Sequence, residues 1–500
     1  MDFLTSCLFC LLLTWFLVQA FHAIRRGRKA CPDKLPPGPR RFPIFGNLFD
    51  LGDKPHKSLA KLANTHGPVM SLKLGSLITV VVSSEKMAKE VLQKHDLTFS
   101  NRTVIDAARA CQHYEVGLPW IPVSPLWRTL RKVCNTHLFT SQKLDSNQFL
   151  RRKKIQELIA NVQKSCQTGE AINIGQAAFN TTINLLSNTI FSMDLVDPNS
   201  PIAQEFRKTV WDIMEVAGKP NLADYFPVLR KIDPQGVRRR MTILFDKLLD
   251  LFGKIFDERL QSRKAQGSTA SKDVLDTLVD IIEGNIEKLN KTHVTHLLLV
   301  LFVAGTDTTS NTLEWAMAEL LHNPQVLLKA KKEIEEVIGK GNPVEESNIN
   351  RLPYLQAIMK ETFRMHPTVP LLLPRRAGAD AEICGFTVPE GAQVLVNAWA
   401  MGRDPSFWEN PNAFMPERFL GSEIDVKGRD FGFIPFGAGR RICPGLPLAN
   451  RMLHLMLGSL IHSFDWKLEG GISPKDMNME EKFGLTLHMA EPLRAIPVLV

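Results

Sequence analysis

Apolar side chains follow a helical period through most of the chain. In residues 56–66 and in roughly 127–322 they recur three and four positions apart, which predicts helices. Residues 69–82 instead alternate between apolar and polar side chains around a Gly-Ser pair, which predicts a β-hairpin. Residues 382–399 form a second strand-rich stretch that glycine and proline interrupt. The pattern therefore predicts a mainly α fold with small β-sheets.

Three further helices can be placed from their boundary residues. Ser84 is expected to cap a helix that runs to about Gln93, and a final helix follows Pro444. Residues 295–322 are predicted to form one long helix with a glycine and three threonines in its centre, at 304–309. A threonine hydroxyl can bond the carbonyl four residues earlier and weaken the helix. We therefore expect a local opening at this point of the helix.

The N-terminal segment has the pattern of a membrane anchor. Residues 3–24 are nearly all apolar, about the 20 residues that a helix needs to cross a bilayer. Basic residues follow at 25–29, which places the C-terminal side in the cytoplasm, whereas a cleaved signal peptide would carry its basic residues first. We expect a transmembrane anchor over 1–24, a basic and proline-rich hinge over 25–45 and one catalytic domain over 46–500.

Composition excludes several classes of protein. The 500 residues are 44% hydrophobic and 23% charged, as in an ordinary globular protein. The net charge of +9 is compatible with nucleic acid, an anionic membrane or an acidic partner, but the chain has no recognised nucleic-acid-binding module. Among its 8 cysteines only Cys7 and Cys10 form a CxxC pair, and that pair lies in the apolar N-terminal run. The other cysteines are scattered, which argues against a disulfide framework or a zinc site and fits a reducing compartment. We expect no nucleic-acid partner.

One cysteine stands in a setting that packing does not require. Cys443 lies in the sequence Phe-Gly-Ala-Gly-Arg-Arg-Ile-Cys-Pro-Gly, residues 436–445. Glycines let the backbone turn tightly and approach a large flat ligand, and neighbouring arginines favour a thiolate over a thiol. Free amides of a tight loop can donate to the sulfur and tune a metal bound to it. The alternative is a glycine-rich turn with an incidental cysteine.

The pattern Phe-x-x-Gly-x-Arg-x-Cys-x-Gly resembles the haem-thiolate loop of the cytochrome P-450 family. Other segments match family motifs in the same order: Ala304–Thr309 is similar to the oxygen-activation motif, Glu361–Arg364 to the Glu-x-x-Arg element and Pro416–Phe419 to the Pro-Glu-Arg-Phe element. The resemblance covers essentially the whole chain. It implies the family fold and a haem b whose iron is held by a cysteine thiolate, here Cys443.

The resemblance also assigns roles to side chains around the cofactor. Asp307 and Thr308 would relay protons to iron-bound dioxygen, because splitting the O–O bond requires protons in a site that excludes water. Glu361, Arg364 and Arg418 would form a structural network that supports the haem loop. His366 is expected to be structural, since Cys443 already supplies the iron ligand. The residues that would contact the haem around the iron ligand are Phe436 in its loop and the propionate partners Trp127, Arg131, Arg375 and Arg441.

Electrons would come from a partner protein. The chain has no dinucleotide fingerprint, so the resemblance implies an NADPH-cytochrome reductase at the endoplasmic reticulum membrane, with the catalytic domain on the cytoplasmic side. Arg128, Lys132 and Arg440 are candidates for a basic patch that docks an acidic reductase. The alternative for these three residues is an ordinary solvated face.

Within the family, the chain resembles plant microsomal terpenoid hydroxylases, particularly geraniol 8-hydroxylases. The resemblance is carried by residues 55–62, 218–222, 233–236, 396–404 and 480–484. The segments that would line the substrate pocket are apolar apart from residues 101–115. By analogy these segments are residues 100–120, 210–226, 297–309, 368–373 and 483–487.

The expected activity is O2- and NADPH-dependent hydroxylation of a small apolar metabolite held mainly by shape, with a monoterpene alcohol such as geraniol as the first candidate. A diterpenoid, a monoterpene indole alkaloid or a phenolic remains an alternative substrate. Two other classes also remain open: an O2-independent haem-thiolate isomerase or dehydratase, and a haem protein without turnover.

Overall fold

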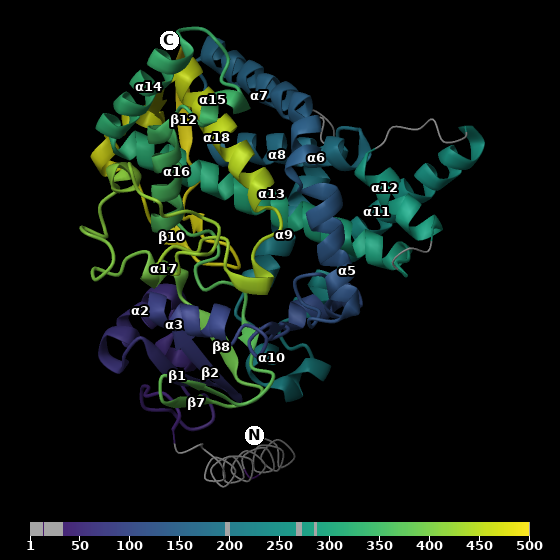
Figure 1. The fold of residues 1–500 in the computed structure, drawn as a ribbon, viewed down its shortest axis with the longest axis vertical. Helices are drawn as coiled ribbons and strands as arrows, with labels where there is room; N and C mark the ends of the chain where they lie inside the picture. The colour runs from purple at the N-terminus through teal and green to yellow at the C-terminus, as the bar shows by residue number, and fades with distance from the viewer. Residues whose placement is uncertain (1–13, 15–33, 196–200, 267–272, 285–287, 500) are drawn as a thin grey trace, which may run out of the picture.

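Helices dominate the computed structural model of this chain, which describes residue 14 and residues 34–195, 201–266, 273–284 and 288–499. Figure 1 shows most of the helices gathered in one part of the molecule, with β1, β2 and β8 in a smaller part beside α2 and α3. The helices are α2 (Pro55–His66), α3 (Glu85–Lys89), α4 (His113–Val116), α5 (Pro125–Val133), α6 (Ser141–Ser146), α7 (Gln148–Thr168), α8 (Ile174–Phe191), α9 (Pro201–Gly218), α10 (Leu222–Tyr225), α11 (Val237–Gln266), α12 (Val274–Glu283), α13 (Lys291–His322), α14 (Pro324–Ile338), α15 (Glu346–Ile349), α16 (Pro353–Met365), α17 (Ala398–Met401) and α18 (Leu446–Ser463).

Four small sheets complete the fold. The largest has the strand order β1-β2-β8-β5-β3, in which β2 and β8 are parallel and the other pairs antiparallel. The others pair β4-β12-β9, β6-β7 and β10-β11. The strands are β1 (Val69–Leu74), β2 (Leu77–Val82), β3 (Asn101–Arg102), β4 (Ile172–Asn173), β5 (Arg375–Arg376), β6 (Ala381–Ile383), β7 (Phe386–Val388), β8 (Gln393–Val396), β9 (Phe464–Leu468), β10 (Glu481–Lys482), β11 (His488–Met489) and β12 (Arg494–Leu499).

Helix α13 organises the main core. It packs against α8, α9, α11, α16 and α18 in the middle of Figure 1, and its residues Leu313–Leu321 are buried without interruption. A helix that is apolar or buried on all sides is typical of the centre of a large domain. The sheet part has its own apolar cluster between β2, β8 and the first helices, around Val80, Val91 and Val394. These two cores hold the loops that carry the candidate site.

The predicted mainly α fold with small sheets is confirmed, and the hairpin over 69–82 is β1 and β2 in full register. Two boundaries differ. The helix after Ser84 ends at Lys89 and continues as a π-helix over Glu90–Lys94, and Ser84 makes no side-chain capping bond. The long helix begins four residues earlier than predicted, where Asn290 and His293 form a reciprocal cap.

The predicted opening at the centre of α13 is wrong. The hydroxyls of Thr306, Thr308 and Thr309 do donate to the carbonyls of Phe302, Ala304 and Gly305, at 2.6, 2.7 and 2.9 Å. The helix nevertheless runs unbroken over Lys291–His322. A carbonyl oxygen has two lone pairs, so the hydroxyl can bond it without displacing the backbone N–H.

The predicted membrane anchor over residues 1–24 and the first part of the hinge lie outside the described residues, apart from residue 14. Within the part of the chain that the structure describes, no helix is both long and apolar enough to cross a bilayer.

Candidate active site

Cys443 occupies the turn between a short 3-10 helix, η7 (Gly439–Arg441), and α18. Its N–H donates to the carbonyl of Phe436 at 3.0 Å, which closes the loop. Gly437 and Gly439 have φ angles of 72° and 68°, the left-handed region that favours glycine. A Cβ on Gly439 would also lie 2.3 Å from the Leu92 carbonyl oxygen, so this glycine is required where the loop passes the π-helix.

The sulfur is oriented toward free amides. Burial raises the pKa of the Cys443 thiol, and the backbone N–H groups of Gly445 and Leu446, at the N-terminus of α18, act in the opposite direction. Arg131 also lowers it, whereas the adjacent Arg440 is exposed and pairs with Asp96 at 2.8 Å. The sequence neighbours Arg440 and Arg441, which were expected to favour the thiolate, are not the cations that act on this thiol; Arg131, which comes from α5, is. A bound metal cation deprotonates such a thiol outright.

Guanidinium groups from distant segments gather beside this loop. Arg441 donates to the carbonyls of Ser100 and Leu118 at 2.9 and 3.2 Å, and its guanidinium lies 4.9 Å from the ring centre of Trp127. Arg375, on β5, donates to Phe99 O at 3.1 Å and leaves its Nε buried without a partner. The pKa of each guanidinium is lowered to about 10, chiefly by burial, and repulsion from Arg375 and Arg131 contributes to the shift of Arg441.

Sequence reasoning missed one member of this group. Arg102 lies on β3 directly opposite Arg375 on β5, donates to Leu373 O at 2.7 Å and has a buried, unpartnered Nε. Burial, then Arg375 and Arg441, lower its pKa well below the ordinary range. The unexpected polarity of residues 101–115 was the signal in the sequence. It did not identify the partner, because β3 meets β5 only in the folded chain.

This arrangement fits a cofactor that carries two carboxylates and a metal ion. Among the described residues, Arg102, Arg131, Arg375 and Arg441 hydrogen-bond only to backbone carbonyls and none of them forms an ion pair with a carboxylate. Buried cations without counter-ions are costly unless an anion is bound. Haem b has two propionates for these groups and an iron for the sulfur of Cys443. The predicted residues Trp127, Arg131, Arg375, Arg441 and Cys443 are thus brought together.

On α13, the motif residues face two different directions. Ala304 is exposed and Thr308 half-buried in the middle of an otherwise buried helix, whereas Asp307 is 1% exposed. Asp307 Oδ2 accepts from Thr486 Oγ1 at 2.7 Å and from Asn311 Nδ2 at 3.2 Å, and its Oδ1 has no partner. Burial raises the pKa of Asp307, with His488 and Thr486 opposing. Neither Thr486 nor His488 has a local sequence signal, since they are about 180 residues away from Asp307 along the chain.

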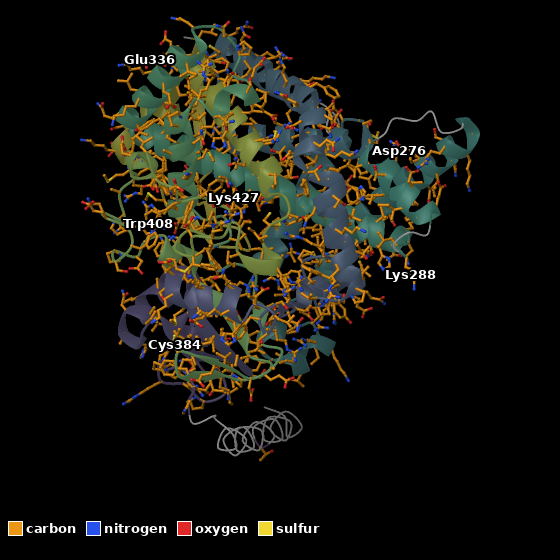
Figure 2. All side chains as sticks on the ribbon, in the orientation of Figure 1. Asp276, Lys288, Glu336, Cys384, Trp408 and Lys427 are labelled. Atoms are coloured by element: carbon orange, nitrogen blue, oxygen red, sulfur yellow. The ribbon has the colours of Figure 1, made fainter. Side chains whose placement is uncertain are left out.

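The predicted support network is confirmed. Arg364 donates through Nε and Nη2 to the two oxygens of Glu361, both at 2.7 Å, and Arg418 Nε donates to Glu361 Oε1 at 3.1 Å. Both cations also lie against the ring of Trp408, which Figure 2 labels. Phe363 of the same helix places its ring 5.1 Å from that of Phe436, so α16 contacts the start of the cysteine loop.

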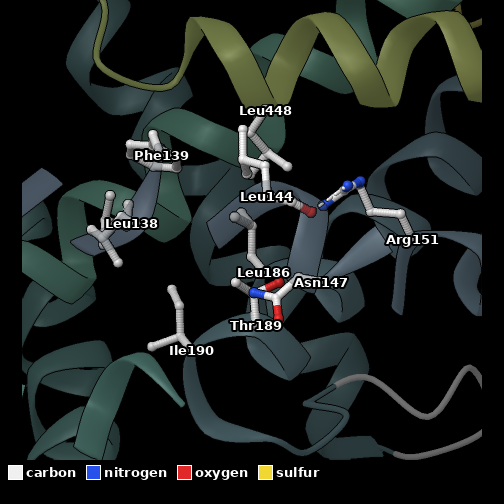
Figure 3. Close-up of a pocket in the computed structure, with 10 residues that line it drawn as sticks. Leu138, Phe139, Leu144, Asn147, Arg151, Leu186, Thr189, Ile190 and Leu448 are labelled. Atoms are coloured by element: carbon white, nitrogen blue, oxygen red, sulfur yellow. Dashed lines mark hydrogen bonds between the residues drawn. The ribbon is translucent and has the colours of Figure 1, made fainter. Parts of the chain in front are cut away.

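Contacts test one further prediction in this region, the structural role of His366. His366 bonds Glu319 at 2.6 Å and stacks on Trp315 at 3.9 Å, which confirms its structural role. Arg128 and Lys132 are exposed, as is Arg440. The pocket in Figure 3, lined by residues such as Leu138, Leu186 and Leu448, includes neither Cys443 nor Asp307.

Comparisons with known proteins agree with this geometry. A sequence profile of the cytochrome P-450 family matches residues 36–492. The chain is 57% identical over 495 residues to a geraniol 8-hydroxylase of Swertia mussotii and 56% identical over 497 residues to one of Catharanthus roseus, with 99% of each chain covered. It is also 56% identical to a drimenol monooxygenase of Persicaria hydropiper, over 93% of this chain and 92% of the relative.

Proposed function

Because this chain belongs to the cytochrome P-450 family, and so is a haem-thiolate monooxygenase, we propose that it hydroxylates geraniol or a related monoterpene alcohol at an allylic methyl group. The observation that carries the substrate is the similarity to two geraniol 8-hydroxylases from end to end of both chains. The balanced reaction inserts one oxygen atom of O2 into a C–H bond and reduces the other to water. It consumes two electrons from NADPH and two protons.

Bound haem would supply the activation of dioxygen, and the side chains of this protein would position it and manage protons. Cys443 would ligate the iron, with the amides of Gly445 and Leu446 holding negative charge on the sulfur. The propionates would be held by Arg102, Arg131, Arg375 and Arg441, whose guanidinium groups converge without carboxylate partners among the described residues. Trp127, whose ring lies against the Arg441 guanidinium, would contact the same end of the haem. Phe436 would fix the start of the ligand loop through its carbonyl bond to Cys443.

Asp307 and Thr308 would deliver protons. Thr308 is on the open side of α13 and Asp307 on the closed side, next to each other in sequence. Burial raises the pKa of Asp307, which makes this carboxyl group a better carrier of a proton than a solvated aspartate. The O2-independent isomerase or dehydratase would have no use for such a group, and a haem protein without turnover would not need it either.

The cellular setting extends the proposal. Residues 1–24 would anchor the chain in the endoplasmic reticulum membrane, 25–45 would form the hinge and 46–500 the catalytic domain on the cytoplasmic side. An NADPH-cytochrome reductase would supply electrons. Arg128 and Lys132 on α5 and Arg440 beside the cysteine loop are exposed cations through which an acidic reductase could dock.

Product analysis tests the activity. Yeast microsomes that carry this chain and a plant reductase would be given geraniol with and without NADPH, and products identified by mass spectrometry. We expect an NADPH-dependent hydroxygeraniol, and none from Cys443→Ser, which should also lose the thiolate-type carbon-monoxide spectrum. Drimenol in parallel would distinguish the two substrate types of the relatives. A normal spectrum with no hydroxygeraniol would reject the substrate and keep the enzyme class.

A further inference from the structure

The turn between β10 and β11 lies against α13 at Asp307. Thr486, in this turn, is 1% exposed and its hydroxyl donates to Asp307 Oδ2 at 2.7 Å. Two bonds of the next residue fix the turn: the N–H of Leu487 donates to Thr368 O at 2.8 Å, and its carbonyl accepts from Trp315 Nε1 at 3.1 Å. The hydroxyl of Thr486 is therefore held in place beside the carboxyl group.

The same hydroxyl continues the chain of contacts outward. His488 Nε2 lies 2.9 Å from Thr486 Oγ1. A hydroxyl has one proton, and Thr486 uses it toward Asp307, so the hydroxyl oxygen is left to accept from His488 in the tautomer that carries its proton on Nε2. The His488 side chain is 16% exposed, and its ring lies edge-on to Trp211 of α9, a residue that is 46% exposed. In that tautomer the contacts run in one direction, from a partly exposed imidazole to a buried carboxyl group.

Asp307 has few other sources of a proton. Its Oδ1 has no partner, and the remaining bond to Oδ2 comes from the amide of Asn311, which does not release a proton at neutral pH. Asp307 itself is 1% exposed, so bulk water does not reach it. Within the part of the chain that is described, Thr486 is the hydroxyl that contacts this carboxyl group.

We propose that His488 and Thr486 are the route by which protons from the surface reach Asp307 during turnover. The inference rests on the proposed proton delivery by Asp307 and Thr308. In one transfer, Thr486 gives its hydroxyl proton to Asp307 Oδ2, His488 gives its Nε2 proton to Thr486, and a proton from water binds His488 Nδ1. One proton enters from solvent, Asp307 becomes a carboxylic acid and no electrons move. His488 and Thr486 act as positioning and relay residues behind the site.

Thr486→Val tests the route, because valine keeps the shape and removes the hydroxyl. General acid–base steps contribute roughly 100-fold or more, so we expect product formed per NADPH to fall about tenfold or more, peroxide to rise, and the solvent deuterium isotope effect to change. Thr486→Ser should restore all three. Trp315→Phe is the matched control, since it removes a bond that anchors the same turn but keeps the relay. Equal effects of Thr486→Val and Trp315→Phe would overturn the proposal and leave Thr486 as a structural anchor.

A measurement that requires no turnover completes the test. The His488 pKa can be followed by NMR in the haem-loaded full chain, assigned with His488→Gln. Burial lowers this pKa, the carboxylate of Asp307 raises it and Lys482 on β10 lowers it. Asp307→Asn should therefore lower it further, and an unchanged titration would overturn the link between the two residues.

The outcomes separate the relay from the proposed function. If geraniol is not oxidised, coupling is measured with whichever substrate gives an NADPH-dependent product, and the NMR result is unaffected. If Asp307→Asn leaves coupling unchanged while Thr308→Ala does likewise, the proposed role of the motif fails. If both variants uncouple but Thr486→Val does not, the route through Thr486 and His488 is overturned by itself.

Discussion

Replacing Arg364 by alanine should destabilise the protein more than any exposed charge substitution, because its guanidinium is central to a buried network. Both Arg364 and Glu361 have side chains that are 0% exposed. Besides its two bonds to Glu361, Arg364 donates to the carbonyls of Gly402, Pro411 and Ala413 at 2.5, 2.7 and 3.1 Å. Removing it deprives all of these acceptors of a donor at once.

The size of the effect follows from what is left behind. Breaking a buried ion pair costs about 3–5 kcal/mol, and each buried carbonyl left without a donor costs about 1–3 kcal/mol. Glu361 retains the N–H of Met415 at 2.7 Å and Arg418 at 3.1 Å, which limits the loss at its carboxylate. We expect Arg364→Ala to lower the free energy of unfolding by at least about 4 kcal/mol, a large part of the roughly 5–15 kcal/mol that domains have.

Urea unfolding of the detergent-solubilised protein, followed by tryptophan fluorescence, measures this difference. Arg494→Ala is the matched control: Arg494 also makes a two-pronged pair, with Glu469 at 2.6 and 3.1 Å, but the side chains are 49% and 45% exposed. Because solvent screens this exposed pair, Arg494→Ala should leave stability almost unchanged. Arg364→Lys, which keeps the charge and loses most of the bonds, should fall between the two and remains measurable if the alanine variant does not fold. A loss below about 1 kcal/mol for Arg364→Ala would refute the reasoning.

Three further predictions concern buried ionisable groups. Arg375→Leu should lower the haem content several-fold, measured as pyridine haemochrome per protein, because it removes a buried cation that would pair with a haem carboxylate. It should not destabilise the haem-free protein, in which this cation is buried and bonds only backbone carbonyls. Burial raises the pKa of Glu314 from 4.5 to about 7, so the folded state binds the extra proton and stability falls as pH rises between these values, by up to about 3 kcal/mol. Glu314→Gln should abolish that slope in urea unfolding at several pH values. Burial lowers the pKa of His113 to about 3 and that of His296 to about 4, and the Nδ1 atoms of the two rings lie 2.8 Å apart. The unfolded chain therefore binds more protons than the folded one below pH 6.5, so the free energy of unfolding falls as the pH falls below this value. His113→Phe should flatten the acid limb of the thermal unfolding profile, and an unchanged limb would contradict this account.

Much of the site could be predicted because its signals are local. The glycines before Cys443 indicate a backbone with positive φ angles, which favours glycine. Glu361 and Arg364 lie one helical turn apart, so the sequence spacing already implies their contact. The Thr308 hydroxyl bond to the carbonyl four residues earlier was predictable for the same reason. The resemblance to a known family supplied the roles of the remaining residues.

The parts that could not be predicted depend on pairings between distant segments. Ser84 has the residue type of a helix cap but makes no capping bond, and the expected opening of α13 does not form because its threonine bonds add to the helix bonds. Local propensity is weak where packing on all sides holds a helix in place. Burial is likewise a property of the whole fold, so no local pattern gives the pKa of Asp307 or Glu314.

Local signals along the chain are enough to give the class of fold, the cysteine loop and the motif on the long helix, because periodicity, glycine placement and short spacings act within a few residues. Which charges converge depends on the folded arrangement of distant segments. It placed Arg102 beside Arg375 through the pairing of β3 with β5, and it placed Thr486 and His488 against Asp307 through the turn that packs on α13. The physical reason is that contacts between residues hundreds of positions apart are set by the packing of the two cores. The pKa and the hydrogen bonds of a buried carboxyl or guanidinium group depend on the neighbours which that packing provides.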